Sequence, residues 1–316
     1  MLQQIPTLED IQATAQRIAP IIHRTPVLTS QSLDALSGAH LFFKCENFQK
    51  IGAFKMRGAS SVGTLLDEER RQKGLATHSS GNHAQAVALT AKMLGVPAYI
   101  VMPTNAPQVK KNAVLGYGAT VIDCAPTIEA RKATLAQTVE KTGAYFIPPY
   151  NDYGVVAGQA TAALELLDEV EGLDVVMAPV GGGGLISGTA LACHYLRPEV
   201  EVIAGEPKNA DDAFRSFHSG QIEPVATATT IADGLRTSLG EKTFGIIKEY
   251  VNDIVTVSEE EIVTAMRHIW ERMKIVIESS CAVPLAVVLQ QAARFKDKKI
   301  GIILTGGNVD LGKLPF

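Results

Sequence analysis

The sequence predicts an α/β protein of two domains, and three observations support this prediction. Short apolar runs typical of strands alternate with longer helical patterns, most clearly between residues 75 and 142. The dipeptide Pro148-Pro149 interrupts this alternation, as a link between domains does. The 316 residues, 46% of them hydrophobic, are enough for two packed cores. We therefore expect a large domain of residues 1–50 and 148–316 and a small, mobile domain of residues 51–147.

Composition excludes several classes of function. A formal net charge of -4 without a long basic run argues against a nucleic-acid partner. No apolar run reaches the length of a membrane span. The N-terminus has neither the charged n-region nor the apolar h-region of a signal peptide. The four cysteines lack CxxC spacing, so they suggest neither a disulfide framework nor a zinc site. We expect a cytoplasmic protein without membrane contact.

The first fifty residues form the beginning of the large domain. Thr7, with Asp10 three residues later, is a capping pattern and predicts a helix over residues 8–19. Residues 27–29 and 41–44 are predicted to be strands.

Lys55 is the centre of the next segment. It lies between Gly52 and Gly58 at the expected start of a helix over residues 54–66, and glycines allow close backbone approach. A partly desolvated lysine beside a second cation, here Arg57, loses its ammonium form and suits Schiff-base chemistry. The competing interpretation is a solvated lysine on a surface helix.

A polar turn follows the next strand and opens an alanine-rich helix. It contains Ser79, Ser80, Gly81, Asn82 and His83. Backbone amides and short polar side chains at a helix N-terminus can hold an anion or an aromatic hydroxyl. For Ser79 alone, an ordinary helix cap is the simpler interpretation. Two more α/β units complete the small domain, with strands over 96–102 and 120–123 and helices over 107–115 and 127–142.

A run of four glycines marks the large domain. A buried strand over residues 175–180 ends in Gly181, Gly182, Gly183 and Gly184, and a helix is expected from Thr189 to Tyr195. Bare amide groups between a strand and a helix bind phosphate. Neither the P-loop pattern nor GxGxxG fits, although Glu206 stands where a ribose-binding acid would. A phosphate loop together with a nucleophilic lysine suggests a cofactor with both a phosphate and an aldehyde, pyridoxal phosphate.

Four segments of the chain carry a family resemblance. They are Gly52–Gly58, Ser79–His83, Gly181–Gly184 and Thr305–Asn308. In this order they resemble the fold-type II pyridoxal-phosphate enzymes, and within these the serine/threonine dehydratase and serine racemase branch. The resemblance covers nearly the whole chain and implies two three-layer α/β domains of the tryptophan-synthase-β-like type. It also implies a homodimer, and leaves nucleotide activation open.

The resemblance assigns the cofactor contacts. It implies Lys55 as the Schiff-base lysine, Asn82 as the partner of the cofactor's ring hydroxyl, Gly181 to Gly184 as the phosphate cradle, and Thr305 beside the pyridine nitrogen. A hydroxyl at Thr305 keeps that nitrogen closer to neutral than an aspartate would, which favours β-elimination over transamination. Ser80 is implied on the opposite face of the substrate Cα, where a returned proton completes racemisation.

The resemblance also implies a divalent-cation site and a nearby acid. Glu206, the carbonyl of Ala210 and Asp212 would bind magnesium, or calcium or manganese, through hard oxygen ligands. The competing interpretation is a solvated acidic turn. Glu278, in a helix-like run over residues 270–278, aligns with an acid near the cofactor ring.

The expected substrates are β-hydroxy amino acids. Their α-carboxylate would rest on the amides from Ser79 to His83, and a loop over residues 231–238, including Ser238, would lie near the cofactor. Arg131 matches a position that brings an arginine toward the site, where it would bind a second carboxylate; a solvated helix arginine is the alternative. The expected reaction is dehydration of L-serine, L-threonine or L-threo-3-hydroxyaspartate to a keto acid and ammonia, with serine racemisation.

Three other functions compete with this one. A β-replacement synthase of the cysteine-synthase type shares the fold, but a TSGNTG-like loop is expected where this chain has Ser79–His83. A nucleotide-dependent oxidoreductase predicts no bound chromophore, and an amino-acid sensor predicts binding without turnover. Because the chain ends at Phe316, soon after the last strand, we expect no regulatory C-terminal domain.

Overall fold

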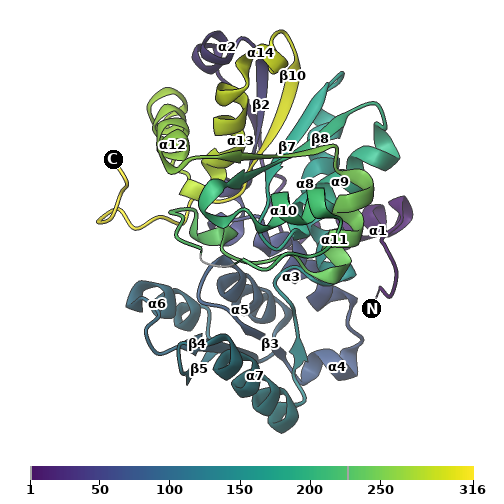
Figure 1. Cartoon of the computed structure of the whole chain (residues 1–316). Coiled ribbons are helices and arrows are strands. Elements are labelled where there is room, and N and C mark those ends of the chain that lie inside the picture. The colour runs from purple at the N-terminus through teal and green to yellow at the C-terminus, as the bar shows by residue number, and fades with distance from the viewer. Residues whose placement is uncertain (1, 226–227) are drawn as a thin grey trace.

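Two sheets with helices on both faces form the molecule (Figure 1). The computed structural model describes residues 2–225 and 228–316. The larger sheet has the strand order β1-β2-β10-β7-β8-β9, and its strands run parallel except β1. The smaller sheet has the order β5-β4-β3-β6 and is parallel throughout. We call the two parts the six-stranded and the four-stranded body.

The strands of the six-stranded body are β1 (Val27–Thr29), β2 (His40–Cys45), β7 (Val175–Pro179), β8 (Glu201–Pro207), β9 (Asp253–Val257) and β10 (Lys299–Leu304). Those of the four-stranded body are β3 (Leu75–His78), β4 (Ala98–Pro103), β5 (Thr120–Cys124) and β6 (Tyr145–Phe146).

The helices are α1 (Leu8–Ile18), α2 (Gln31–Ser37), α3 (Lys55–Leu65), α4 (Glu68–Gln72), α5 (Asn82–Leu94), α6 (Gln108–Gly116), α7 (Ile128–Thr142), α8 (Tyr153–Glu169), α9 (Gly184–Leu196), α10 (Asp212–Ser219), α11 (Glu241–Tyr250), α12 (Glu259–Met273), α13 (Ser279–Gln290) and α14 (Ala292–Phe295). Short 3-10 turns are η1 (Glu46–Phe48), η2 (Lys50–Gly52), η3 (Lys208–Ala210) and η4 (Asp233–Leu235).

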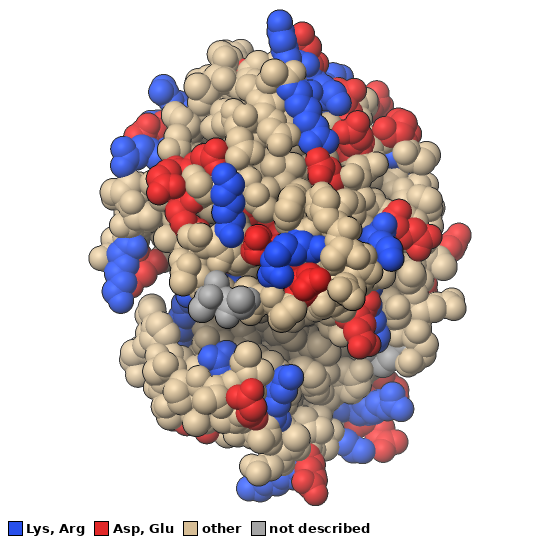
Figure 2. Space-filling view, in the orientation of Figure 1, with Lys and Arg blue, Asp and Glu red and all other residues tan. Residues whose placement is uncertain are grey.

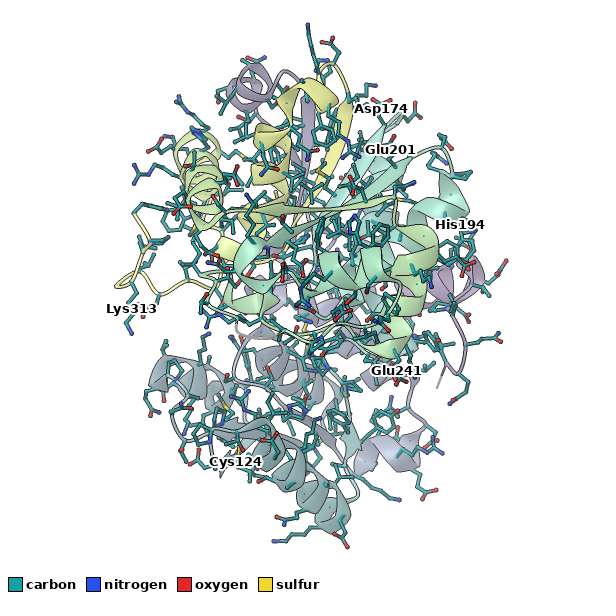
Figure 3. The ribbon with its side chains drawn as sticks, viewed as in Figure 1. Cys124, Asp174, His194, Glu201, Glu241 and Lys313 are labelled. Carbon is teal, nitrogen blue, oxygen red and sulfur yellow. The ribbon has the colours of Figure 1, made fainter. Side chains whose placement is uncertain are left out.

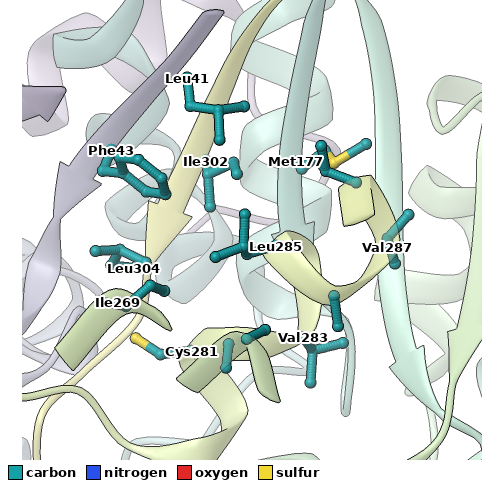
Figure 4. Packing of buried hydrophobic residues seen from close by; sticks show 14 of the residues in the cluster. Leu41, Phe43, Met177, Ile269, Cys281, Val283, Leu285, Val287, Ile302 and Leu304 are labelled. Atoms are coloured by element: carbon teal, nitrogen blue, oxygen red, sulfur yellow. The ribbon is translucent and has the colours of Figure 1, made fainter. Parts of the chain in front are cut away.

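The six-stranded body is a three-layer sandwich. Helices α12 and α13 pack on one face of its sheet, and α8 and α9 pack on the other. Figure 4 shows the first of these cores, in which Phe43 and Ile302 of the strands meet Leu285 of α13. Five of the six residues of β10 are buried, as expected for a central parallel strand covered on both faces. The α/β fold class is therefore confirmed.

The four-stranded body repeats this plan on a smaller scale. Helix α5 covers one face of its sheet and α7 covers the other. Helix α3 packs against both α5 and α8, so it lies at the junction of the two bodies. Lys55 is the first residue of that helix.

Two of the expected helix boundaries are wrong. Helix α9 begins at Gly184 instead of Thr189, because a Cβ at Gly188 would meet a backbone nitrogen of α8 at 2.6 Å, and this close packing outweighs the low helix propensity of glycine. The expected helical run to Glu278 also fails: α12 ends at Met273, with Lys274 in the left-handed conformation as its C-cap. Glu278 instead precedes α13 as its N-cap residue.

Two surface properties bear on function. None of the helices that the structure describes is long and apolar enough to cross a membrane. On the face shown in Figure 2, basic and acidic side chains are intermingled.

Candidate active site

Lys55 points its amine toward the segment that joins the bodies. Its Nζ donates a hydrogen bond of 2.8 Å to the Pro149 carbonyl oxygen and lies 4.9 Å from the centre of the Phe54 ring. Burial lowers the pKa of this amine from 10.5 to about 8. A lysine with such a pKa is partly unprotonated near neutral pH, as a nucleophile or general base must be.

Burial, and not Arg57, lowers the pKa of Lys55. The prediction that Arg57 would do this is wrong, because its guanidinium pairs with Glu46 and Glu165 at 2.7 and 2.8 Å. Desolvation is the cause of the low pKa of Lys55, and the negative charge of Glu278 partly opposes it.

Asn82 and Glu278 face each other across the junction. The Asn82 amide nitrogen lies 3.1 Å from both carboxylate oxygens of Glu278, and the Asn82 amide oxygen accepts a bond of 2.9 Å from Asn308. Glu278 is only 5% exposed, and burial raises its pKa to about 7 even though the Asn82 bond favours the charged form. The three residues come from α5, the start of α13 and the segment after β10.

The polar turn after β3 leads directly into α5, which begins at Asn82. Ser79 Oγ accepts a hydrogen bond of 3.3 Å from the Gly81 amide, and Ser80 lies partly exposed in the turn. His83 is buried, and its Nε2 lies 2.9 Å from the Ile147 carbonyl oxygen. Burial, with the nearby charge of Lys55, lowers the pKa of His83 to about 3, so its ring is neutral. A carbonyl oxygen only accepts, so the neutral ring donates from Nε2, and its Nδ1 has no partner among the described residues.

The glycine run lies buried at the N-terminus of α9. No hydrogen-bond acceptor within the described residues is found for the N–H groups of Gly181 to Gly184, although all four residues are buried. Gly183 has φ of 88° and caps the N-terminus of α9. A Cβ on Gly182 would meet the Tyr150 ring at 2.3 Å, so only glycine fits there. Buried N–H groups without acceptors at a helix N-terminus fit a phosphate.

Thr305 is brought to the Lys55 segment by β10. Its carbonyl oxygen accepts a 3.0 Å bond from the Phe54 amide, and Ala53 pairs with Gly306 in an isolated bridge. The Thr305 hydroxyl donates to Cys281 Sγ at 3.4 Å and is almost fully buried.

The two acids expected to bind a cation in the turn after β8, Glu206 and Asp212, are buried, although the turn between them is partly exposed. The Glu206 carboxylate accepts bonds of 2.9 and 2.7 Å from the Ala213 and Phe214 amides, and both carboxylate oxygens of Asp212 are buried without a partner in the described chain. Burial raises the pKa of Glu206 to about 9 and that of Asp212 to about 6. Within the described residues no three acidic, histidine or cysteine side chains gather around one point, so the expected site depends on the Ala210 carbonyl as well.

Arg131 and Ser238, the two remaining predicted substrate contacts, lie in different surroundings. The positive charge of Arg131 lies close enough to act on His78 and Cys124, at the ends of β3 and β5; Figure 3 labels Cys124 in the four-stranded body. Burial and this charge lower the pKa of His78, whereas burial raises the pKa of Cys124 and the charge of Arg131 partly opposes that rise. The Nε of Arg131 is buried and has no partner among the described residues. Ser238 Oγ accepts a bond of 3.0 Å from the Val225 amide, and no hydrogen bond links it to the other candidate residues.

Sequence reasoning missed two residues of the site. Tyr150 follows Pro149, whose carbonyl accepts from Lys55, and packs its ring on Gly182. Its position next to the two prolines was the sequence feature that could have indicated a place in the site. Asn308 lay inside a recognised motif, but its hydrogen bond to Asn82 joins residues 226 positions apart.

Comparison with known proteins identifies the family. Residues 18–306 match the model of the pyridoxal-phosphate dependent enzymes. The chain is 51% identical to beta-hydroxyaspartate dehydratase of Paracoccus denitrificans (strain Pd 1222) over 312 residues, which cover 99% of each chain. It is 47% identical to L-threo-3-hydroxyaspartate ammonia-lyase of Saccharomyces cerevisiae (strain ATCC 204508 / S288c), covering 97% of this chain and 94% of the relative. Its structure is similar to serine racemase of Dictyostelium discoideum, with a TM-score of 0.93, 50% identity and coverage of 96% and 99%. The chain therefore belongs to the pyridoxal-phosphate dependent enzymes of fold type II.

Proposed function

We propose that this protein is an ammonia-lyase that dehydrates a β-hydroxy amino acid to a keto acid and ammonia, and that it also racemises serine. The observation that carries the proposal is the Lys55 amine, whose pKa burial lowers to about 8 at the junction of the two bodies. Relatives with such activities, named above, support it.

The cradle and its neighbours fit the cofactor. The free N–H groups of Gly181 to Gly184 would hold the phosphate, Asn82 the ring hydroxyl, Thr305 the ring nitrogen, and Lys55 the covalent link. When bound, the cofactor supplies the electron sink that makes the Cα proton of an amino acid acidic.

Two residues of this chain would move the protons. Lys55 takes the Cα proton as general base, since its pKa lies close to neutrality. Ser80, in the turn before α5, returns a proton to the other face of Cα when the substrate is racemised. Elimination of the β-hydroxyl needs only the first step at Cα, so the two activities depend on different residues.

The substrate's carboxylates would meet separate partners. The backbone amides from Ser79 to His83 bind the α-carboxylate at the N-terminus of α5. Arg131, which forms no ion pair among the described residues, binds the second carboxylate of 3-hydroxyaspartate. Ser238 stays a predicted substrate contact.

Glu206, Asp212 and the Ala210 carbonyl would hold a divalent cation. The unpartnered, buried oxygens of Asp212 support this, because a buried carboxylate without a donor is costly unless a cation joins it. Oxygen ligands alone favour magnesium or calcium, with manganese as a further candidate.

We infer that the four-stranded body corresponds to a mobile domain of residues 51–147 and the rest to the large domain. Lys110 of α6 forms an ion pair of 3.0 Å with Asp233 of η4 and so connects the two bodies at their rim. The homodimer, the cytoplasmic location and nucleotide activation stay predictions.

Steady-state kinetics on L-serine, L-threonine and L-threo-3-hydroxyaspartate test the proposal, with D-serine formation measured alongside. We expect keto acid from at least one substrate, and none from Lys55→Ala, which should still fold. Absence of keto acid from all three would refute dehydration. A β-replaced amino acid formed without keto acid would favour the cysteine-synthase type instead.

A further inference from the structure

Arg57 uses all five of its N–H donors inside the protein. Nε and Nη2 donate to the two oxygens of Glu46 at 2.7 and 2.8 Å. Nη1 and Nη2 donate to the two oxygens of Glu165 at 2.8 Å each, and Nη1 also donates to Thr161 Oγ1 at 3.0 Å. Two bidentate pairs on one planar guanidinium fix its orientation as well as its position. Helix α3 is thereby tied to both η1 and α8.

The acceptors of Arg57 are themselves held in place. Lys44 Nζ lies 2.8 Å from a Glu165 oxygen and donates to the Thr25 carbonyl at 2.6 Å, while the Thr25 hydroxyl donates to Glu46 at 2.6 Å. Arg57, Lys44 and Glu46 are completely buried. Two cations face Glu46 and Glu165, and Lys44 also lies 3.4 Å from Glu169, a more exposed carboxylate that pairs with Arg24. The loss of one buried member leaves a buried charge unpaired.

A buried ion network is a poor way to gain stability, because apolar side chains of similar volume often do as well. Its distinctive property is a fixed geometry. Lys55 and Arg57 are two residues apart on α3, which places them roughly 200° apart around the helix axis. A rotation of α3 therefore cannot move one side chain without moving the other.

The backbone around Lys55 is held on both sides. The Phe54 amide donates to the Thr305 carbonyl at 3.0 Å, and the Gly58 amide donates to the Gln159 side chain at 3.2 Å. At Gly158 an added Cβ would meet the Arg57 carbonyl oxygen at 2.6 Å, so α3 and α8 are in backbone contact. The guanidinium adds the only charged attachment of this turn to α8 among the described residues.

We propose that Arg57 is a positioning residue for the reaction: its five hydrogen bonds fix the rotation of α3 so that Lys55 presents its amine to the cofactor site. This inference rests on the proposed function of Lys55. It assigns a role to a buried cation that the catalytic steps themselves do not use.

The first test compares Arg57→Lys with the wild-type enzyme. Lysine keeps the charge but cannot form two bidentate pairs. We expect kcat to fall by roughly 10²-fold, the effect of misplacing a catalytic group by about 1 Å, with a much smaller change in KM. In cofactor-free protein, the attachment of pyridoxal phosphate to Lys55, followed by its visible absorption, should slow in parallel. Loss of stability alone changes neither quantity per folded molecule.

Chemical rescue of Arg57→Ala is the second test. A surface cavity of about 620 Å³ is lined by Thr161 and Glu165, two of the partners of Arg57, and gives a small cation a route to them. Methylguanidinium should restore cofactor attachment at least severalfold, and urea at the same concentration should not. Arg294→Ala is the control, because Arg294 pairs with Asp253 at 2.6 Å near the surface and does not line this cavity. It should behave like wild type and ignore methylguanidinium.

Thr161→Val and Glu165→Gln keep the test decisive if the Arg57 variants do not fold. Each variant removes some of the hydrogen bonds that hold the Arg57 guanidinium. We expect several-fold slower cofactor attachment in Glu165→Gln and a smaller effect in Thr161→Val. Wild-type kcat and attachment rates in the folded fraction of all these variants would overturn the proposal. If the wild type turned over no β-hydroxy amino acid, the proposed function would fail, yet cofactor attachment would still report on the positioning of Lys55.

Discussion

Glu278→Gln should stabilise the cofactor-free protein at alkaline pH. Burial raises the pKa of Glu278 from 4.5 to about 7, so folding favours the protonated carboxyl. The stability gained from the neutral form is fully present below pH 4.5 and is lost as the pH rises toward 7. At about 1.4 kcal/mol per unit, this shift corresponds to a loss on the order of 3 kcal/mol above pH 7. Only 5% of the residue is exposed, so solvent screens little of that cost.

Glutamine keeps an acceptor oxygen for the Asn82 amide and carries no charge. The free energies of unfolding of Glu278→Gln and wild type should therefore agree near pH 4.5 and differ by up to about 3 kcal/mol at pH 8, with the variant more stable. Urea titrations of both proteins without cofactor, at pH steps between 4.5 and 8, measure the difference.

The exposed Glu271→Gln is a matched control, since it removes a carboxylate from the surface of α12 and should leave the pH dependence unchanged. A Glu278→Gln variant that is less stable than wild type at pH 8, or a difference that does not change with pH, would refute the reasoning. The first result would mean that the Asn82 contact outweighs the cost of burying the charge.

Three further predictions concern the proposed site. Ser80→Ala should abolish most interconversion of L- and D-serine while keto acid formation survives; chiral chromatography and a keto acid assay measure both, and a parallel loss of the two activities contradicts the assignment. Adding magnesium or calcium to chelator-treated wild type should raise its thermal midpoint, and Asp212→Ala should show no such rise. If the wild-type midpoint does not change with either ion, Glu206 and Asp212 have a structural role instead. Arg131→Ala should lower kcat/KM for L-threo-3-hydroxyaspartate by roughly 10- to 150-fold, the worth of a charge-assisted bond of about 1.5 to 3 kcal/mol, and change L-serine little. Equal losses on both substrates would remove Arg131 from specificity.

The sequence was sufficient to predict where three candidate turns lie within their own sheets, because each follows the carboxyl end of a parallel strand. Ser79 follows β3, Gly181 lies just beyond β7, and Thr305 follows β10. Each lies where a strand ends and a turn begins, which is where ligands bind in α/β sheets. The strand pattern and the local composition of these turns depend only on residues that are close in sequence, so both can be recognised without a structure.

The partners of these residues were not predictable in the same way. Arg57 lies beside Lys55 in the sequence, and proximity suggested that its charge acts on the lysine. Its acceptor Glu165 lies 108 residues further along the chain, and only the packing of α3 on α8 brings it near. Asn82 and Glu278 are 196 residues apart, and the helix expected through Glu278 hid its position at the start of α13. A charge acts on the groups that the fold places beside it. An argument about a pKa from neighbours in sequence therefore fails where contacts between distant segments determine that pKa.

Several buried polar groups of the candidate site have no partner in the protein. Among the described residues, buried side-chain atoms without a hydrogen-bond partner include Arg131 Nε, His83 Nδ1 and both carboxylate oxygens of Asp212. An unsatisfied buried polar group costs about 1 to 3 kcal/mol, and the amides of Gly181 to Gly184 add to that cost. Other such atoms, on Asn47, Glu259 and His268, lie outside the proposed ligand contacts, so the feature is not confined to them. The Gly181–Gly184 amides, Asp212 and Arg131 are, however, where a phosphate, a cation and a second carboxylate are proposed to bind. If these ligands bind as proposed, they supply the missing hydrogen-bond partners, and each should then stabilise the folded protein in proportion to its occupancy.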